Sequence, residues 1–344
     1  MTRPAAIGQG NTPVVESLRI GPQVGLRIFF KLELCNPSGS YKDRFVAAQI
    51  TEFLERNVKS CIATSSGNTG ASLACFSARY GITCTIFVSE FAPSGKLQQM
   101  QAHGARVFRV KDFVASPAVT DAVYRRLEQI SSDNGIPIVV SAYKYCPEGM
   151  KGVEQIAAEL VSQCRDKLDH VFVPVGGGGL FAAVCRGFSA VTGIRPKIHA
   201  VQPEGCATVV SAYEERRNTI VPVISTTSVS GLSVPYDIDA SLALAELIRS
   251  GGRGVAVSDS EIFETQQWMM REEGIWCEPA GAAALAGCLR TKRAGLIDDG
   301  ETVACLVTGH GFKDPASLAG IAEANPVGLV EEPEIGTELL GVSI

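Results

Sequence analysis

Short apolar runs alternate with longer amphipathic segments along most of the chain. The runs are six to eight residues long, and they read RIFFKLE (27–33), SCIATSS (60–66), TCTIFVS (83–89), ARVFRV (105–110), HVFVPVG (170–176), KIHAVQP (197–203) and TVACLVTG (302–309). Most of them are followed by a segment with helical periodicity, such as TGASLACFSARYG. Strand–helix alternation of this kind is typical of parallel sheets covered by helices. We therefore predict an α/β fold with two lobes, each a mainly parallel twisted sheet covered by helices.

The chain of 344 residues is long enough for two lobes with separate cores. A new apolar strand begins after a helical segment near residue 170, as expected where the chain enters a second lobe. We predict a large domain from residues 1–50 and 150–325, a small mobile domain from 51–149, and a C-terminal tail at 326–344.

Composition excludes several classes of function. The net charge is −5, from 31 basic and 36 acidic residues, whereas a nucleic-acid binder normally carries a basic face. The N-terminal residues lack the apolar core of a signal peptide. No uninterrupted apolar stretch reaches the roughly 18 residues that a membrane span needs. We expect a cytoplasmic protein that binds neither membranes nor nucleic acid.

Eleven cysteines and four histidines need an explanation. No two cysteines form a C-x-x-C pair, and most lie within apolar segments, where free thiols behave as small hydrophobic side chains. The histidines are dispersed, without the spacing of metal ligands. We predict buried free thiols and no metal site.

The segment NPSGSYKDR (36–44) places a lysine at the start of a helix. Asn36 to Gly39 are typical of a tight turn, and Ser40 is expected to cap a helix, with Asp43 completing a capping box. Lys42 then lies in the first turn, where the helix macrodipole disfavours a cation by roughly 0.3–1 kcal/mol. An amine whose ammonium form is disfavoured gives up its proton more easily and attacks a carbonyl more readily.

Four consecutive glycines, Gly176 to Gly179, join an apolar strand to a helix in VPVGGGGLFAAV. Such a run costs conformational entropy, so the site must require bare backbone. A loop that opens a helix presents N–H groups suited to a phosphate. The spacing does not match G-x-G-x-x-G, because Phe181 stands where the third glycine should be, nor does it match a P-loop. A single phosphate monoester fits better than a dinucleotide or a triphosphate.

Two further strand ends carry polar groups. Ser65, Ser66, Asn68 and Thr69 lie at the start of a helix, where they form a nest able to bind a carboxylate, although an ordinary helix cap is the alternative. Thr308 ends an apolar strand, at the edge where α/β proteins usually bind ligands. Together with Lys42 and the glycine loop, these groups suit pyridoxal phosphate and an amino acid.

The ordered motifs NPSGSYKDR, SSGNTG, VPVGGGGL, EPAGAAALAG and TGHGFKDP resemble those of the fold type II (tryptophan synthase β-like) pyridoxal-phosphate enzymes. The resemblance spans roughly residues 9 to 316. Within this group GQGNTPVVES and VTGHGFKDP look most like threonine synthase, whereas GGGGLF and EPAGAAALAG look more like the serine/threonine dehydratases.

The resemblance implies a role for each matched residue toward the cofactor. Lys42 would bind pyridoxal 5′-phosphate covalently and later move the α-proton of the substrate. Asn68 would hydrogen-bond the ring hydroxyl, and Gly176 to Gly179 would hold the phosphate. Lys31 is the rival lysine, but its place within an apolar strand predicts a charge on the surface of the sheet.

The same resemblance implies that Ser65, Ser66 and Thr69 bind the substrate carboxylate. Thr308 would face the pyridine nitrogen, and a neutral hydroxyl there would not hold that nitrogen protonated. Elimination and replacement are then favoured over transamination. Glu278 of CEPAGA is an additional candidate, although this segment is also an ordinary helix start.

One segment departs from the threonine synthase pattern. Threonine synthases usually carry an Asn-Pro-x-Arg-x-x-Gly-x-Lys-Thr-like sequence whose arginine helps to bind the substrate phosphate. In SAYKYCPEGMKGVEQ, Gly149 and Lys151 match, but Cys146 stands where the arginine belongs. Lys144 or Lys151 remains available to an anion, and we include Lys151 among the predicted substrate-binding residues.

We predict a homodimeric lyase or synthase that eliminates or replaces a β- or γ-substituent of an L-amino acid, with threonine synthase as the nearest activity. A β-replacement synthase that uses O-phosphoserine, as cysteate synthase does, and a serine/threonine dehydratase are the alternatives. From other classes, a non-catalytic pyridoxal-binding or partner-regulating protein and a nucleotide-binding dehydrogenase are less favoured.

Overall fold

The apolar runs form two separate sheets in the computed structural model, which describes residues 3–114, 116–164, 168–191, 193 and 195–323. The larger sheet has the order β1-β2-β10-β7-β8-β9 and the smaller one β5-β4-β3-β6. The strands are β1 (Val14–Glu16), β2 (Arg27–Leu32), β3 (Ser60–Ala63), β4 (Thr83–Ser89), β5 (Arg106–Val110), β6 (Ile138–Val139), β7 (His170–Pro174), β8 (Lys197–Pro203), β9 (Gly254–Val257) and β10 (Thr302–Val307). Every described strand pair is parallel except β1 with β2. The prediction of an α/β fold with mainly parallel sheets is confirmed, and all seven predicted strands are present.

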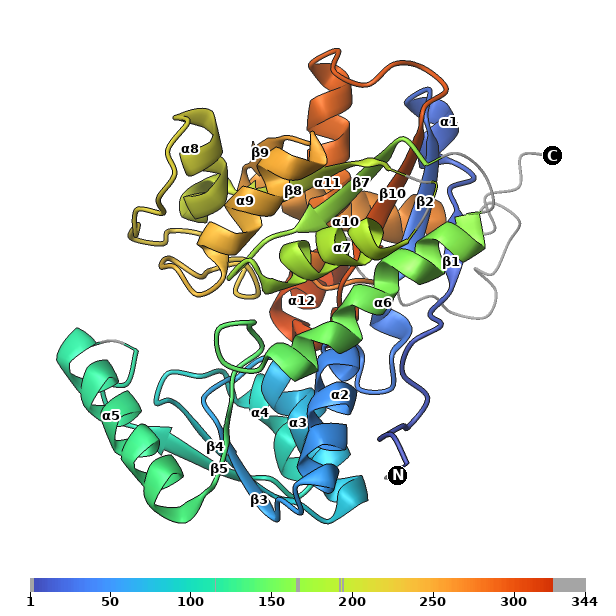
Figure 1. The fold of residues 1–344 in the computed structure, drawn as a ribbon. Coiled ribbons are helices and arrows are strands. Elements are labelled where there is room, and N and C mark those ends of the chain that lie inside the picture. Colours follow the sequence, from blue (N-terminus) through green and yellow to red (C-terminus); the bar gives the residue numbers. More distant parts are fainter. Residues whose placement is uncertain (1–2, 115, 165–167, 192, 194, 324–344) are drawn as a thin grey trace, which may run out of the picture.

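The two sheets lie in separate lobes, with α6 between them (Figure 1). The helices are α1 (Ile20–Gln23), α2 (Lys42–Glu55), α3 (Asn68–Tyr80), α4 (Ser94–Ala102), α5 (Pro117–Asn134), α6 (Pro147–Cys164), α7 (Gly179–Ala190), α8 (Thr208–Glu214), α9 (Ala240–Ser250), α10 (Asp259–Glu273), α11 (Pro279–Arg293) and α12 (Pro315–Glu323). Short 3₁₀ turns cover Glu33–Cys35, Glu204–Cys206 and Gly311–Lys313. The domain boundaries stay a prediction; residue 50 falls inside α2, which packs against both α3 and α6.

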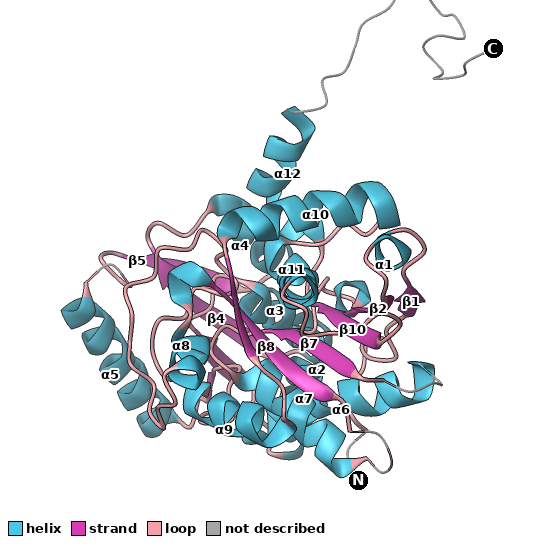
Figure 2. Cartoon of the chain, turned by 90° about the horizontal axis from the view of Figure 1, so that it is seen from above, coloured by secondary structure: helices cyan, strands magenta, loops and turns pink. Residues whose placement is uncertain are grey.

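Helices cover both faces of the larger sheet (Figure 2). Successive side chains of a strand point to opposite faces, so each strand contributes to two cores. On β10, Ala304 and Leu306 belong to the cluster shared with α6, α7 and α9, whereas Val303, Cys305 and Val307 belong to the cluster shared with α10 and α11. Burial on both faces explains why these strands are continuous apolar runs without polar alternation.

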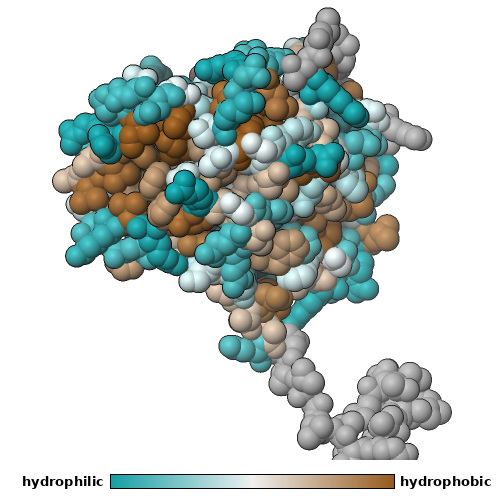
Figure 3. Space-filling view, turned by 90° about the horizontal axis from the view of Figure 1, so that it is seen from below, coloured by the Kyte–Doolittle hydropathy of each residue, from teal (hydrophilic) through white to brown (hydrophobic). Residues whose placement is uncertain are grey.

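All eleven cysteines are free thiols, and nine of them are buried, as predicted; Cys75 is half-buried and Cys35 is exposed. Within the described residues, no group of three or more His, Cys, Asp and Glu side chains is arranged to hold a metal ion. No helix of the described chain is both long and apolar enough to cross a membrane. Viewed from below, the surface carries apolar patches separated by polar side chains (Figure 3).

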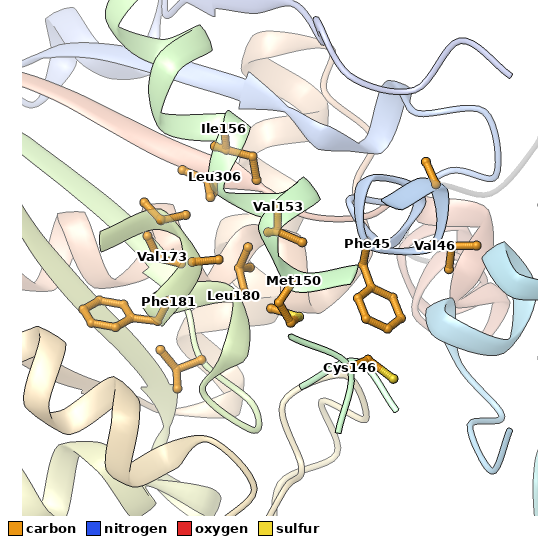
Figure 4. Close-up of a cluster of buried hydrophobic side chains, with 14 of the residues drawn as sticks. Phe45, Val46, Cys146, Met150, Val153, Ile156, Val173, Leu180, Phe181 and Leu306 are labelled. Atoms are coloured by element: carbon orange, nitrogen blue, oxygen red, sulfur yellow. The ribbon is translucent and has the colours of Figure 1, made fainter. Parts of the chain in front are cut away.

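Helix α6 joins the cores of the two lobes. Its residues Met150, Val153 and Ile156 are fully buried, and Figure 4 shows them between Phe45 of α2 and side chains of the larger sheet and α7. Gly152 is a point of close approach, because a Cβ there would lie 2.3 Å from the carbonyl oxygen of Arg44. This packing fixes the position of α2, and therefore of Lys42, relative to the larger sheet.

Candidate active site

A cavity of about 820 Å³ is lined by residues of both lobes. Its walls are formed by the ends of strands and the loops that follow them, where ligands bind in α/β proteins. The lining includes all the residues that the sequence predicted at the site except Lys151: Lys42, Ser65, Ser66, Asn68, Thr69, Gly176, Gly177, Gly178, Gly179 and Thr308. The structure therefore brings together segments that are far apart in the chain.

Lys42 begins α2, as predicted, and its Nζ donates a hydrogen bond to Ser141 Oγ at 2.8 Å. The predicted cap is wrong: Ser40 makes no side-chain cap and instead forms a fully buried bridge with Gly309. The Ser40 hydroxyl is buried and has no hydrogen-bond partner among the described residues. The first turn is instead anchored by Asp43.

The Asp43 carboxylate is buried and accepts three hydrogen bonds. They come from the Ser38 backbone N–H at 2.6 Å, from Ser38 Oγ at 2.5 Å and from Ser72 Oγ of α3 at 2.5 Å. Burial raises the pKa of Asp43, and the three donors oppose that rise. Asp43 thus ties the turn before Lys42 to the smaller lobe.

The loop after β10 pairs with two other segments of the site. The Tyr41 N–H donates to the Thr308 carbonyl at 3.0 Å, and the His310 N–H donates to the Gly39 carbonyl at 2.9 Å. The Glu278 N–H donates to the Gly309 carbonyl at 3.0 Å. Thr308, Glu278 and the turn before Lys42 are therefore held together by backbone hydrogen bonds.

The glycine loop is tightly packed at three of its four positions, Gly176, Gly178 and Gly179. A Cβ at Gly176 would lie 3.0 Å from the Gly231 carbonyl oxygen, and one at Gly178 would lie 2.4 Å from the Asp239 carbonyl oxygen. Gly178 also has φ near +98°, a conformation that favours glycine. Helix α7 begins at Gly179, so its first N–H groups have no partner within the helix and point toward the loop. The loop suits an anion that binds through backbone N–H groups.

The SSGNTG turn ends at α3 and faces Glu278. Asn68 Nδ2 donates to Glu278 Oε1 at 2.9 Å, so the carboxyl group fixes the orientation of the amide. Burial raises the pKa of Glu278 to about 6, although the Lys313 ammonium and the Asn68 amide act in the opposite direction. Gly70 allows the turn to close, because a Cβ there would lie 2.2 Å from the Ser65 carbonyl oxygen.

Sequence reasoning missed three residues that line the cavity: Ser141, Lys96 and Lys313. Ser141 follows β6 and could have been found by the argument applied to Thr308, a hydroxyl at the end of a parallel strand. Lys96 Nζ donates to Ser230 Oγ, and Lys313 Nζ donates to Gln99 Oε1. Burial lowers the pKa of Lys313. Lys313 lies within the TGHGFKDP motif, whereas no local pattern marks Lys96, which only the tertiary structure brings to the cavity.

The structure does not bring Lys151 to the cavity. Its side chain is 61% exposed on α6 and pairs with Glu148 at 2.7 Å. Cys146, which stands in place of the expected arginine, is buried. The interpretation of Lys31 as a charge on the sheet surface is wrong: Lys31 is fully buried and donates to Glu159 Oε2 at 2.6 Å.

These residues fit the cofactor that the resemblance implies. Lys42 supplies an amine at the cavity wall, and the glycine loop supplies a bare backbone cradle for a phosphate. Asn68 and Thr308 supply neutral polar groups from opposite lobes, and Ser65, Ser66 and Thr69 remain as donors for a carboxylate. An amine at a helix start, an anion cradle and a second anion nest together suit pyridoxal phosphate with an amino acid.

Comparison with known proteins agrees with this geometry. A family model described as "Pyridoxal-phosphate dependent enzyme" matches residues 5–309. A threonine synthase from Methanocaldococcus jannaschii is 34% identical over 324 residues, which cover 92% of this chain and 78% of that protein. Maize serine racemase superposes with a TM-score of 0.78 at 23% identity, covering 91% of this chain and 92% of that one. The processed form of threonine deaminase isoform 2 from Solanum lycopersicum gives the same TM-score and identity, covering 92% and 84%.

Proposed function

The chain belongs to the pyridoxal-phosphate dependent enzyme family, and we propose that it is a lyase or synthase acting on an L-amino acid with an activated side chain. The observation that supports this most directly is the meeting of Lys42, the glycine loop and the SSGNTG nest in one cavity. The cofactor, when bound, supplies an electron sink for the charge left when the α-proton departs.

The residues of the chain have distinct proposed roles. Lys42 holds the cofactor covalently and then moves the proton at the substrate Cα, with Ser141 Oγ, 2.8 Å away, orienting its amine. The N–H groups at Gly176 to Gly179 bind the cofactor phosphate. Asn68, held by Glu278, meets the ring hydroxyl, and Thr308 meets the ring nitrogen as a neutral group.

Ser65, Ser66 and Thr69 bind the substrate carboxylate through hydroxyl and backbone donors at the start of α3. A carboxylate bound there directs the substrate side chain toward the rest of the cavity. Besides Lys42, the lysines that line this cavity are Lys96 and Lys313. Lys96 comes from α4 of the smaller lobe and Lys313 from the segment after β10, so both lobes contribute to this wall.

We propose that the reaction is that of threonine synthase, in which O-phosphohomoserine and water give threonine and phosphate. The 34% identity to the Methanocaldococcus jannaschii threonine synthase supports it. One observation favours the alternatives, a β-replacement synthase that uses O-phosphoserine or a serine/threonine dehydratase. Lys151 points away from the cavity and Cys146 replaces the expected arginine, so this segment supplies no cation for a substrate phosphate.

Absorption spectroscopy and chemical trapping test the assignment of Lys42. The purified protein should show a visible band that borohydride removes, and peptide mapping should place the trapped cofactor on Lys42. Lys42→Ala should abolish the trapped product and retain the fold, whereas Lys151→Ala, which removes an exposed lysine, should change neither. A protein that takes up no pyridoxal phosphate, or a Lys42→Ala variant that still traps it, would contradict the proposal.

Product analysis separates the candidate reactions. O-phosphohomoserine, O-phosphoserine, serine and threonine are incubated one at a time with the enzyme, and threonine, phosphate, 2-oxo acid and ammonia are measured. Equal amounts of threonine and phosphate from O-phosphohomoserine support threonine synthase, whereas 2-oxo acid and ammonia from serine or threonine indicate a dehydratase. Binding of the cofactor without turnover of any of them would favour the non-catalytic alternative.

The homodimer stays a proposal as well. Light scattering of the purified protein checks it, and a mass near 36.4 kDa, that of one chain, would contradict it.

A further inference from the structure

Asp239 lies at the start of α9, but its carboxylate does not cap that helix. The side chain is buried and accepts the backbone N–H of Tyr143 at 2.6 Å and that of Lys144 at 3.2 Å. Burial raises the pKa of Asp239, and these two N–H groups oppose that rise. A buried carboxylate that leaves its own helix uncapped must have its stabilising partners in another segment.

The same residue contacts the glycine loop. The Asp239 N–H donates to the Gly177 carbonyl at 2.9 Å. Its carbonyl oxygen lies 2.4 Å from the position of a Cβ on Gly178, and its Oδ2 lies 2.9 Å from the position of a Cβ on Gly179. Asp239 thus occupies the space that side chains at these two glycines would need, which explains why the backbone there is bare.

The segment that Asp239 holds carries Ser141. Tyr143 and Lys144 follow Ser141 by two and three residues, and the Ser141 carbonyl oxygen lies 3.5 Å from the Cβ position of Gly179. Ser141 Oγ in turn accepts the hydrogen bond from Lys42 Nζ. A continuous series of contacts therefore runs from the glycine loop through Asp239 and Ser141 to the amine of Lys42.

We propose that Asp239 is a positioning residue that sets the place of Ser141, and through it of the Lys42 amine, relative to the glycine loop. The inference rests on the proposed function of Lys42 and the glycine loop. One carboxylate fixes the distance between the two groups that would hold the cofactor at its opposite ends, the phosphate cradle and the amine. Preorganisation of this kind matters because misplacement of a reacting group by about 1 Å costs roughly 10²-fold in rate.

Asp237 provides a matched control two residues away. It is exposed, and its carboxylate accepts the backbone N–H of Ser241, in the first turn of α9, at 3.0 Å and Ser241 Oγ at 2.5 Å. It does not line the cavity and touches neither the glycine loop nor the Ser141 segment in any described hydrogen bond. Loss of Asp237 should therefore weaken α9 without affecting the Lys42 amine.

The experiment measures attachment of pyridoxal 5′-phosphate to the cofactor-depleted full-length protein. The rate of borohydride-trapped product on Lys42 is compared for the native protein, Asp239→Asn, Asp237→Asn and Ser141→Ala. Asp239→Asn keeps the volume of the side chain but turns an NH₂ group toward a backbone N–H. We expect this variant to slow attachment at least tenfold. Asp237→Asn should leave the rate unchanged, even if it lowers the urea midpoint of unfolding as much as Asp239→Asn does.

The double variant Asp239→Asn/Ser141→Ala distinguishes positioning from a general structural role. If Asp239 acts through Ser141, its substitution has little further effect once the Ser141 hydroxyl is gone. A tenfold slowing in both backgrounds, or equal rates for Asp239→Asn and Asp237→Asn, would overturn the inference while leaving the role of Lys42 intact. Failure of the native protein to attach pyridoxal 5′-phosphate at Lys42 would overturn the proposed function too. Should Asp239→Asn not fold, Asp239→Ser takes its place, with the same expected results.

Discussion

Glu159 of α6 lies at the centre of a buried charge network next to the site. Its carboxylate accepts hydrogen bonds from Arg44 Nη1 and Nη2, each at 2.6 Å, and from Lys31 Nζ at 2.6 Å. Arg44 follows Lys42 by two residues and also pairs with buried Glu33 at 2.7 Å. The side chains of Arg44 and Lys31 are 1% and 0% exposed, so substitution of Glu159 by Gln leaves two buried cations short of a counter-charge.

The magnitude follows from the pKa of Glu159. Burial raises this pKa, but the hydrogen bonds and charges of Arg44 and Lys31 outweigh burial and lower it from 4.5 to about 2. Since one pKa unit corresponds to about 1.36 kcal/mol, the ionised carboxylate contributes about 3 kcal/mol at pH 7. Removal of one partner of a buried ion pair typically costs about 3–5 kcal/mol, which agrees with a contribution of about 3 kcal/mol. We expect Glu159→Gln to lower the free energy of unfolding by about 3 kcal/mol.

The sign of the pH dependence is fixed by the lowered pKa. The contribution is complete above the unfolded pKa of 4.5 and is lost as the pH falls toward 2. At pH 3 the unfolded chain binds a proton that the folded one does not, and the contribution falls to about 1.5 kcal/mol. The difference between the native protein and Glu159→Gln should therefore halve between pH 7 and pH 3.

Urea unfolding followed by far-ultraviolet circular dichroism measures this difference. Glu148→Gln is the control, because Glu148 lies on the same helix and its pair with Lys151 is more than half exposed. Exposed pairs contribute about 0–1 kcal/mol, so this variant should unfold almost as the native protein does. Equal losses for the two variants, or a Glu159→Gln difference that does not change with pH, would refute the reasoning.

Three further predictions concern the walls of the cavity. Because burial raises the pKa of Glu278 from 4.5 to about 6, its ionisation opposes folding increasingly as the pH rises from 4.5 to 6 and fully above pH 6. Glu278→Gln should therefore raise the free energy of unfolding at pH 8 by up to about 2 kcal/mol, with the gain vanishing near pH 4.5; a gain independent of pH would contradict this. Gly178→Ala should cost at least about 2 kcal/mol in urea unfolding and weaken pyridoxal-phosphate binding, since its Cβ would lie 2.4 Å from the Asp239 carbonyl oxygen, whereas Gly193→Ala should spare binding. Asp259 accepts hydrogen bonds from Thr227 Oγ1 and from the Ser228 N–H and Oγ at 2.6–2.7 Å, so Asp259→Ala should speed hydrogen exchange in the loop leading to the cavity; unchanged exchange there would show that the loop is held otherwise.

Local patterns were sufficient for seven of the ten described strands and for most of the residues expected at the cavity, but they did not predict the short strands β1, β6 and β9. Each of the seven predicted apolar runs contains a strand, and a turn with Gly39 at φ near +91° precedes the helix that begins with Lys42. Four glycines between a strand and a helix leave few uses other than binding through the backbone. These features depend on neighbours within a few residues, so they can be read from the sequence.

The environment of each polar side chain depended on distant segments instead. The apolar neighbours of Lys31 predict a surface charge, yet its ammonium group is buried against Glu159, 128 positions later. Ser40 is a good helix cap by composition, but pairing with Gly309 holds its backbone in a bridge. Local sequence cannot supply these partners, because they are determined by the order and register of strands.

The sequence by itself determined the cofactor chemistry: an amine at a helix start, a phosphate cradle and a strand-end hydroxyl are each local motifs. Only the tertiary structure decided what surrounds that amine. Parallel strands order the larger sheet so that β2 and β7 flank β10, and their loops meet at one edge. Glu278 bonds to the loop after β10, Ser141 comes from the segment after β6 of the smaller sheet, and Asp239 bonds to that segment from the start of α9. Position in space selects these partners, because hydrogen bonds act over a few ångströms whatever the separation along the chain.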